Sequence, residues 1–343
     1  MDYESALAYE PPVNWDRVTV IDSHAGGEPF RVVVDGLPEI PGETVLRRRR
    51  YAMANLDDLR RALMWEPRGH ADMYGGWIGS PVAKGSDLSV LFLHNDGFST
   101  MCGHGVIAMG TVLLETGMLP PHEPETSIRI DTPAGTVSVV SSVSSGRVTG
   151  TRFRNVSSFV ADLDATIDVD GLGEVRYDLA FGGAFYALVT ASDIGVRLDD
   201  AARLIDAGRR IKGSITAARD IVHPDDPDLG FLYGVIFTGP PESPRHHSRN
   251  VCVFADGEID RSPTGTGVSS RLAVMSARGE IGVDEEIAVE SIVGSVFRGR
   301  IVERSEGPPP TIIPEISGTA HLTGRSEYWL DPDDPLGGGF LLR

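Results

Sequence analysis

The sequence predicts an α+β protein built from two pseudo-symmetric lobes. Short β-branched and apolar runs outnumber the amphipathic stretches and do not alternate strictly with them, which disfavours a doubly wound sheet. Three glycine-containing segments also occur twice, in the same order and with a nearly constant offset, which indicates an internal duplication. A chain of 343 residues is long enough for two hydrophobic cores, and we expect a ligand site in the cleft between them.

The duplication is clearest at two glycine-rich turns. Residues 102–106 read CGHGV and residues 264–268 read TGTGV, and each turn leads into an apolar stretch that fits a helix. The other matched pairs are HAGGEPF (24–30) with AFGGAFY (180–186), and IDTPAGTV (130–137) with VESIVGSV (289–296). The two halves therefore repeat one unit, and they differ in having a thiol at one helix entrance and a hydroxyl at the other.

The boundary between the lobes is expected near a stretch of small and polar residues, 141–150 (SSVSSGRVTG). The first lobe is expected to cover residues 1–147 and to carry Cys102. The second lobe is expected to cover residues 148–327, and the last residues, 328–343, are expected to pack back on the first lobe.

The individual elements follow from local periodicity. Strands are predicted where β-branched and apolar residues form short runs, at 18–21, 88–92, 137–140, 234–237 and 251–254. Helices are predicted at 56–64, 105–115, 199–212 and 267–278. The basic run Arg47–Arg50 follows a Pro-Gly turn and Glu43, and we interpret it as a solvated edge.

Composition argues against several classes of function. The net charge of −18 disfavours nucleic-acid binding, because phosphate contacts need a concentrated basic surface. No apolar stretch approaches the roughly 20 residues that cross a bilayer, so no membrane association is expected. The acidic N-terminal segment lacks the apolar region of a secretory signal, and two cysteines give no disulfide framework, so we expect a cytoplasmic protein. No cluster of metal ligands stands out, and the pair His246–His247 is interpreted as part of a loop.

The two glycine-rich turns are candidate anion sites. The first residues of a helix present unpaired N–H groups and the positive end of the helix dipole. Two such ends facing each other across a cleft would hold one carboxylate from both sides, through Gly103 and His104 of one lobe and Gly265 and Thr266 of the other. No Lys follows the glycines, so a phosphate-binding loop is a weaker alternative.

Cys102 is the candidate general base. The helix dipoles are expected to lower the pKa of a thiol at the helix entrance and so favour the thiolate. The alternative is that Cys102 is a small buried residue, which is the commonest role of a free cysteine. Cys252 lies within a predicted strand between valines, and we expect it to contribute only to packing.

Two further side chains remain open in function. Asp260 occupies the position that matches Phe98 in the first half, so only one half places a carboxylate four residues before its chemical residue. Asp260 would hold an ammonium or iminium group beside the carboxylate site, or it would cap a turn before Ser262 and Pro263. His104 is a candidate second acid or base, or it orients the turn.

The motifs MCGHG (101–105), DRSPTGTG (260–267) and IDSHAGGEPFR (21–31) resemble those of the proline racemase family, and the resemblance extends over essentially the whole chain. It implies a fold similar to diaminopimelate epimerase, with a sheet curled around a central helix in each lobe. It also implies a homodimer, a cytoplasmic amino-acid-catabolic enzyme and no cofactor. Ala25 departs from the threonine that often follows the histidine in this family.

The resemblance also assigns roles to residues. Racemases and epimerases of the family have cysteine at both motif positions, whereas Thr264 here resembles the branch that dehydrates trans-3-hydroxy-L-proline. By this resemblance Cys102 is the proton acceptor and Asp260 holds the ring nitrogen. The substrate carboxylate binds to the two turns, through Gly103, His104, Gly265 and Thr266.

Elimination needs only one base, and the neutral Thr264 hydroxyl is a poor base, so this reasoning supports a lyase, and the resemblance implies that it works without a cofactor. Its product would be Δ2-pyrroline-2-carboxylate, which tautomerises to the Δ1 imine. A proline or 4-hydroxyproline racemase or epimerase is the first alternative. A non-catalytic amino-acid-binding protein is the second.

Overall fold

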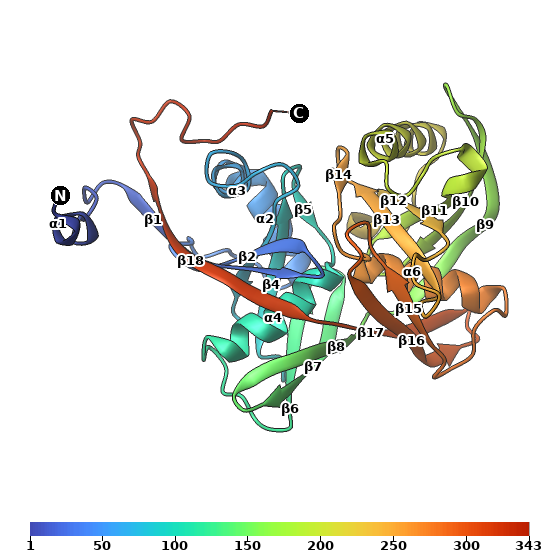
Figure 1. Cartoon of the computed structure of the whole chain (residues 1–343), viewed down its shortest axis with the longest axis horizontal. Helices are drawn as coiled ribbons and strands as arrows, with labels where there is room; N and C mark the ends of the chain where they lie inside the picture. Colours follow the sequence, from blue (N-terminus) through green and yellow to red (C-terminus); the bar gives the residue numbers. More distant parts are fainter. Residues whose placement is uncertain (343) are drawn as a thin grey trace.

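The computed structural model describes residues 1–342 and forms two lobes side by side (Figure 1). Each lobe wraps strands around one central helix, α4 (Gly103–Glu115) in the first lobe and α6 (Gly265–Ala277) in the second. Most residues of both helices are buried, on nearly every face, as expected for a helix enclosed by a sheet. The predicted α+β class with two pseudo-symmetric lobes is confirmed.

The first lobe contains nine strands around α4. They are β1 (Asp16–Ala25), β2 (Glu28–Asp35), β3 (Tyr74–Gly79), β4 (Leu88–His94), β5 (Phe98–Ser99), β6 (Glu125–Thr132), β7 (Gly135–Ser144), β8 (Arg147–Arg154) and β18 (Ala320–Leu330). The pairs β2–β3 and β4–β6 are parallel, and the other pairs within this lobe are antiparallel.

The second lobe repeats this arrangement around α6. Its strands are β9 (Ser158–Val169), β10 (Gly173–Phe181), β11 (Phe185–Thr190), β12 (Leu232–Gly239), β13 (Ser248–Phe254), β14 (Glu258–Ile259), β15 (Glu286–Glu290), β16 (Val296–Ser305) and β17 (Thr311–Gly318). The pairs β11–β12 and β13–β15 are parallel, and they correspond to the parallel pairs β2–β3 and β4–β6 of the first lobe. The repeated order of parallel and antiparallel pairs is the structural counterpart of the sequence duplication.

The chain passes between the lobes twice, at neighbouring places. It leaves the first lobe between β8 and β9, and it returns between β17 and β18. The end of β17 pairs with β8 of the first lobe, and its beginning pairs with β9 of the second. After the return, β18 pairs with β1 along its length, from Asp16 opposite Leu330 to Ala25 opposite Ala320.

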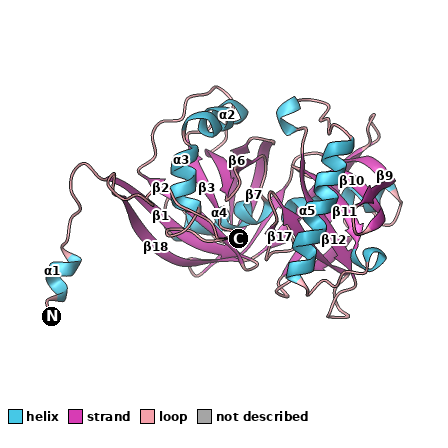
Figure 2. Ribbon diagram, turned by 90° about the horizontal axis from the view of Figure 1, so that it is seen from above, coloured by secondary structure: helices cyan, strands magenta, loops and turns pink. Residues whose placement is uncertain are grey.

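The remaining helices lie outside the two sheets (Figure 2). They are α1 (Tyr3–Leu7), α2 (Val45–Asn55), α3 (Asp57–Met64), α5 (Ala201–Ala218) and the short 3-10 helices η1 (Ala191–Ile194) and η2 (Pro227–Leu229). The four helices predicted from periodicity are present, and α5 continues six residues beyond its predicted end. The predicted connection 141–150 is wrong as a linker, because it contains the end of β7, a turn and the start of β8, which form a hairpin.

The interpretation of Arg47–Arg50 as a solvated edge holds for Arg47 and Arg50, which are exposed, but is wrong for Arg49, which is buried. These residues lie in α2, where the Thr44 side chain caps the helix by accepting a hydrogen bond from the Arg47 backbone N–H. Arg49 is buried, and its guanidinium donates two hydrogen bonds to the Phe98 carbonyl, at 2.9 and 2.6 Å. A guanidinium can be buried here because its hydrogen bonds to this backbone carbonyl offset the cost of removing it from water.

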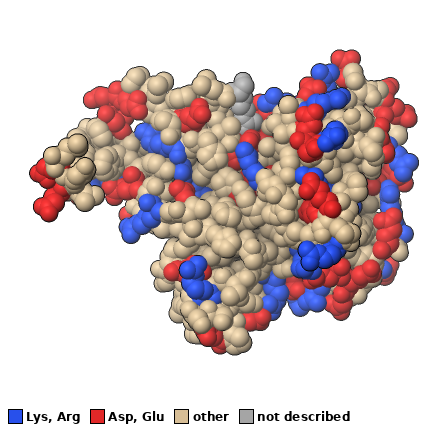
Figure 3. All heavy atoms as spheres, in the orientation of Figure 1, with Lys and Arg blue, Asp and Glu red and all other residues tan. Residues whose placement is uncertain are grey.

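The surface carries both signs of charge. On the face shown in Figure 3, Lys and Arg side chains lie interspersed with Asp and Glu. Within residues 1–342, none of the helices has the length and apolar character needed to span a bilayer.

Candidate active site

The N-termini of α4 and α6 meet end to end between the lobes. A Cβ atom added to Gly103 would lie 2.6 Å from the Gly265 Cα, and one added to Gly265 would lie 2.8 Å from the Gly103 Cα. Only glycine permits this approach, because any side chain would collide with the backbone of the opposite helix. Two positive helix ends therefore converge on one buried place, which an anion between them would stabilise.

Cys102 and Thr264 occupy the N-cap positions of these two helices. The Cys102 sulfur accepts a hydrogen bond from the Gly105 N–H at 3.2 Å, as an N-cap residue does. Thr264 makes no such cap bond and adopts a φ of 64°, which is strained for a β-branched residue. The duplicated turns thus differ in backbone conformation as well as in side chain. Such strain is typical of functional sites.

A small cavity of about 10 Å³ lies at this meeting point. Its wall contains all seven residues that the sequence singled out: Cys102, Gly103, His104, Asp260, Thr264, Gly265 and Thr266. The wall also contains six residues that sequence reasoning did not assign to a site: Tyr74, Met101, Tyr186, Tyr233, Cys252 and Phe254. A cavity of this size holds about one water molecule, so an amino acid enters only if the lobes separate.

Some of the missed residues carried a readable signal. Tyr74-Gly75 begins β3 and Tyr233-Gly234 follows the first residue of β12, and these two strands hold equivalent positions in the two lobes. A search for further repeats would have found this pair. Cys252 is buried as expected, but the expectation that it only packs is incomplete, because its side chain also lines the cavity.

Cys102 and His104 form a close pair. The Cys102 sulfur lies 3.3 Å from the His104 Nδ1. Burial lowers the pKa of His104 to about 3, so its imidazole is neutral at physiological pH. The neutral imidazole can form a hydrogen bond with the Cys102 sulfur, but it has no positive charge to stabilise a thiolate.

The expected lowering of the Cys102 pKa is not what the structure shows. Burial raises the pKa of the thiol well above its usual value, and the charges of Asp260 and Glu28 raise it further. The hydrogen bond from Gly105 acts in the opposite direction but is outweighed. Desolvation of the thiolate is therefore the dominant effect in the closed site. A substrate ammonium group placed beside the sulfur would counter the two carboxylates.

Asp260 and Thr264 form a second close pair on the α6 side. The Thr264 hydroxyl donates a hydrogen bond of 2.8 Å to one Asp260 oxygen, and the Ser262 N–H donates one of 2.7 Å to the other. Burial raises the pKa of Asp260 to about 6, in spite of these hydrogen bonds. The Thr264 hydroxyl is thus engaged as a donor, and the only carboxylate in the cavity wall is Asp260.

Three interactions between the lobes flank the cavity. The Arg261 N–H donates to the Glu28 carboxylate at 2.7 Å, and the Arg261 guanidinium pairs with Asp72 at 2.9 Å. The Thr100 hydroxyl donates to the Gly183 carbonyl at 2.7 Å. These contacts hold the lobes in the closed arrangement and exclude water from the cavity.

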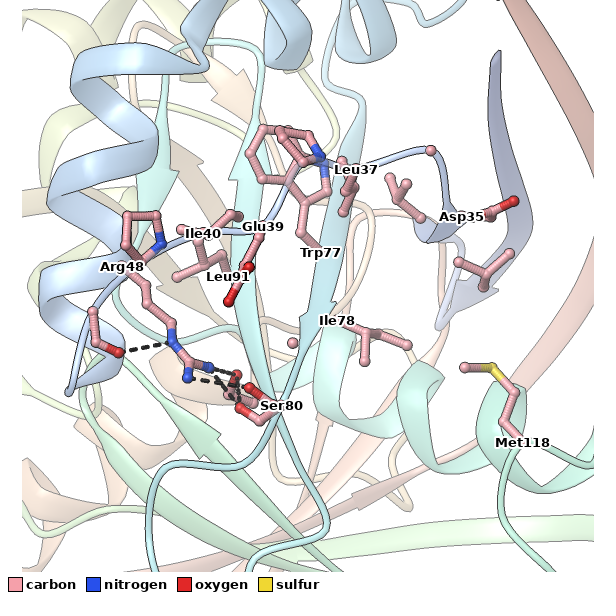
Figure 4. Close-up of a pocket in the computed structure, with 18 residues that line it drawn as sticks. Asp35, Leu37, Glu39, Ile40, Arg48, Trp77, Ile78, Ser80, Leu91 and Met118 are labelled. Atoms are coloured by element: carbon pink, nitrogen blue, oxygen red, sulfur yellow. Dashed lines mark hydrogen bonds between the residues drawn. The ribbon is translucent and has the colours of Figure 1, made fainter. Parts of the chain in front are cut away.

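A much larger cavity, about 440 Å³, lies in the first lobe beneath the segment 35–42 (Figure 4). Its Arg48 guanidinium is already bound to the Ser80 carbonyl and the Ser89 hydroxyl, at 2.6 and 2.8 Å. The wall otherwise consists largely of apolar side chains and holds no histidine or cysteine. The small cavity between the helix ends is therefore the better candidate for the active site. Among residues 1–342, no group of His, Cys, Asp and Glu side chains is arranged to hold a metal ion.

The pKa of Asp260 gives a testable pH dependence. Because this pKa is raised to about 6, the carboxylate is protonated below that pH and would no longer attract an ammonium group bound beside it. We expect kcat/KM to fall as the pH drops through 6, and to rise again on the alkaline side as the Cys102 thiol ionises. Initial rates measured across the pH range check this. In Asp260→Asn the limb near pH 6 should disappear, and its persistence would assign it to another group.

Comparison with known proteins identifies the family. The sequence model of the proline racemase family matches residues 20–341. The chain belongs to the proline racemase family. It is 43% identical over 329 residues to a trans-3-hydroxy-L-proline dehydratase of Burkholderia ambifaria, covering 95% of this chain and 98% of that protein. It is also 43% identical over 329 residues to a 3-hydroxyproline 2-epimerase of Burkholderia multivorans, with the same coverage.

Among solved structures of the proline racemase family, a hydroxyproline epimerase from Agrobacterium vitis with bound trans-4-hydroxy-L-proline superposes with a TM-score of 0.92. Its sequence is 34% identical, and the match covers 96% of each chain. The resemblance read from the three sequence motifs is thereby confirmed, and the chain is an enzyme. The alternative of a non-catalytic binding protein is set aside.

Proposed function

We propose that the protein dehydrates trans-3-hydroxy-L-proline without a cofactor. The observation that carries this proposal is the difference between the two helix entrances, where Cys102 is a thiol beside a neutral histidine and Thr264 is a hydroxyl already donated to Asp260. One base is enough for elimination, whereas inversion at Cα uses a group on each face of the ring. The dehydratase name of the relative from Burkholderia ambifaria supports the same reaction.

The converging helix ends suit the substrate carboxylate. The N–H groups of Gly103, His104, Gly265 and Thr266 lie at the two N-termini and belong to the cavity wall. The ring ammonium would then pair with Asp260, the carboxylate of that wall. Because the closed cavity is so small, the substrate enters an open form, and binding energy from the carboxylate draws the helix ends together.

The stereochemistry of the substrate fits a single base. In trans-3-hydroxy-L-proline the hydroxyl is trans to the carboxylate and thus lies on the same face as the Cα hydrogen. The Cys102 thiolate removes that hydrogen, and the hydroxyl leaves from the same face as water, in a syn elimination. The product is Δ2-pyrroline-2-carboxylate, which tautomerises to the Δ1 imine.

The direct test is incubation of the purified, reduced enzyme with trans-3-hydroxy-L-proline. The cyclic imine forms a coloured adduct with o-aminobenzaldehyde, and its appearance supports dehydration. Absence of the adduct from folded enzyme, with inversion at Cα detected by polarimetry, would establish the epimerase instead.

A racemase or epimerase remains the second candidate because two relatives, at 43% and 44% identity, carry epimerase names. The variant Thr264→Cys distinguishes the two. It restores a second thiol at the α6 entrance, and cysteine, which is not β-branched, tolerates the left-handed backbone no worse than threonine. We expect it to gain inversion at Cα while dehydration falls. Chiral chromatography of proline incubated in D₂O separates inversion from exchange with retention. Wild-type enzyme that already inverts proline at the rate of the variant would contradict the single-base proposal.

Three expectations from the sequence accompany this proposal. We expect a homodimer in a cytoplasmic location, and we expect activity without an added metal or cofactor. Size-exclusion chromatography with light scattering and assays after exhaustive chelation check the first and the last.

A further inference from the structure

Loss of the 3-hydroxyl group requires a proton donor, because hydroxide is a poor leaving group. The donor must act on the face where Cys102 removes the Cα proton, since the hydroxyl lies on that face. Asp260 and Thr264 lie at the opposite helix entrance and bind each other. His104 lies on the correct side, but it carries no ionisable proton near neutral pH, because burial lowers its pKa to about 3.

One unassigned group remains on the Cys102 side of the cavity. Tyr74 begins β3 in the first lobe, is buried, and lines the cavity beside Cys102. Its ring meets the His104 ring edge to face with centroids 4.8 Å apart. Tyr74 is among the smaller influences that lower the pKa of the Cys102 thiol, against the dominant effect of burial.

The Tyr74 hydroxyl is held in place by two other hydroxyl groups. It lies 2.5 Å from the Ser99 hydroxyl and 3.0 Å from the Tyr233 hydroxyl. Tyr233 is the equivalent tyrosine of the second lobe, so the two phenols meet at the centre of the duplicated structure. Burial raises the pKa of Tyr74 well above its usual value, which keeps the phenol protonated until a leaving group takes its proton.

We propose that Tyr74 is the catalytic acid that protonates the departing 3-hydroxyl group, and that Ser99 and Tyr233 position it. This role rests on the proposed dehydratase function. The Cα–H bond breaks, its proton passes to the Cys102 sulfur, and its electron pair forms the C2–C3 double bond. The C3–O bond breaks with its electron pair on oxygen, and that oxygen takes the Tyr74 proton and leaves as water. The Cys102 thiol then returns a proton to the Tyr74 oxygen, which restores both groups.

The variant Tyr74→Phe tests this role by separating proton abstraction from loss of the leaving group. Exchange of the Cα hydrogen of L-proline with D₂O needs the thiolate but no acid. Formation of the imine from trans-3-hydroxy-L-proline needs both. We expect the ratio of imine formation to exchange to fall about 10²-fold or more, since general acid catalysis contributes this much. Tyr177→Phe is the matched control, because Tyr177 is a buried tyrosine in the apolar core of the second lobe, and its ratio should not change.

A second substrate sharpens the test. The analogue trans-3-fluoro-L-proline loses fluoride, which leaves with far less help from an acid. We expect Tyr74→Phe to eliminate fluoride at a rate that follows its exchange rate, so that the defect is restricted to the hydroxyl substrate. Equal defects with both substrates, or an unchanged ratio, would overturn the role of Tyr74 while leaving dehydration intact. Wild-type enzyme that exchanges L-proline but forms no imine would instead overturn the proposed function, and the role of Tyr74 with it.

Discussion

Cys102→Ser is expected to reduce dehydration of trans-3-hydroxy-L-proline by at least about 10³-fold, within the range that a general base contributes. Sulfur and oxygen differ little in size, so the N-cap hydrogen bond to Gly105 can persist and the fold should be retained. The loss is chemical, because a serine hydroxyl ionises far less readily than a thiol. The same variant should lose exchange of the Cα hydrogen of L-proline with D₂O. The o-aminobenzaldehyde assay and NMR measure the two losses.

The other cysteine provides the control for this variant. Cys252 lines the same cavity but lies on β13, away from the helix entrance of α4. Cys252→Ala removes a thiol of equal burial, and its effect should be much smaller than that of Cys102→Ser. A variant Cys102→Ser with substantial activity, or a larger loss in Cys252→Ala, would assign the base to another residue.

Gly103→Ala should reduce kcat/KM by about 10²-fold or more, because a single methyl group keeps the helix ends apart. The new Cβ would lie 2.6 Å from the Gly265 Cα and 3.0 Å from the Thr266 nitrogen. These are backbone atoms, so the collision cannot be relieved by a change of side-chain rotamer. The carboxylate would then lose the contacts of one helix end, and a misplacement of about 1 Å is enough to cost 10²-fold in rate. Steady-state kinetics should show a raised KM together with a lowered kcat.

Matched glycine variants separate this collision from a general effect of alanine. Gly213 lies within α5 with open space around it, so Gly213→Ala should leave the kinetics unchanged. Gly265→Ala introduces the reciprocal collision, at 2.8 Å from the Gly103 Cα, and should reproduce the defect. If Gly103→Ala and Gly213→Ala have the same activity, the helix ends do not need to meet during turnover.

Much of the fold could be predicted because the duplication is visible in the chain. The glycine turns, the strand patterns and the two apolar helices are local features, and two copies of one pattern reinforce each other. Helix α2 was missed because its sequence, VLRRRRYAMAN, has no clear apolar stripe and is held by buried contacts such as Arg49 to the Phe98 carbonyl. Those contacts depend on tertiary structure, which local periodicity does not contain.

The candidate site was predicted where it depends on helix entrances and missed where it depends on strands. Cys102 and Thr264 could be identified from the sequence because each is followed by a glycine-rich turn that begins a helix. Tyr74 and Tyr233 lie far apart in sequence, and their meeting at 3.0 Å depends on how the lobes close. The upward shift of the Cys102 pKa could not be predicted either. The sequence indicates the helix dipole, which lowers this pKa, but not the depth of burial, which raises it.

The two neighbouring crossings of the chain have a consequence for how the molecule can be divided. Since β18, the last strand, completes the first lobe beside β1, that lobe is assembled from both ends of the polypeptide. A protease that cleaves the backbone once, between β8 and β9, would leave two fragments that still share the pairing of β8 with β17 and of β1 with β18. The nicked enzyme should therefore stay together, and the N-terminal half of the gene expressed alone encodes a first lobe that lacks β18. A circular permutant opened between β17 and β18 would bring each lobe into one continuous stretch.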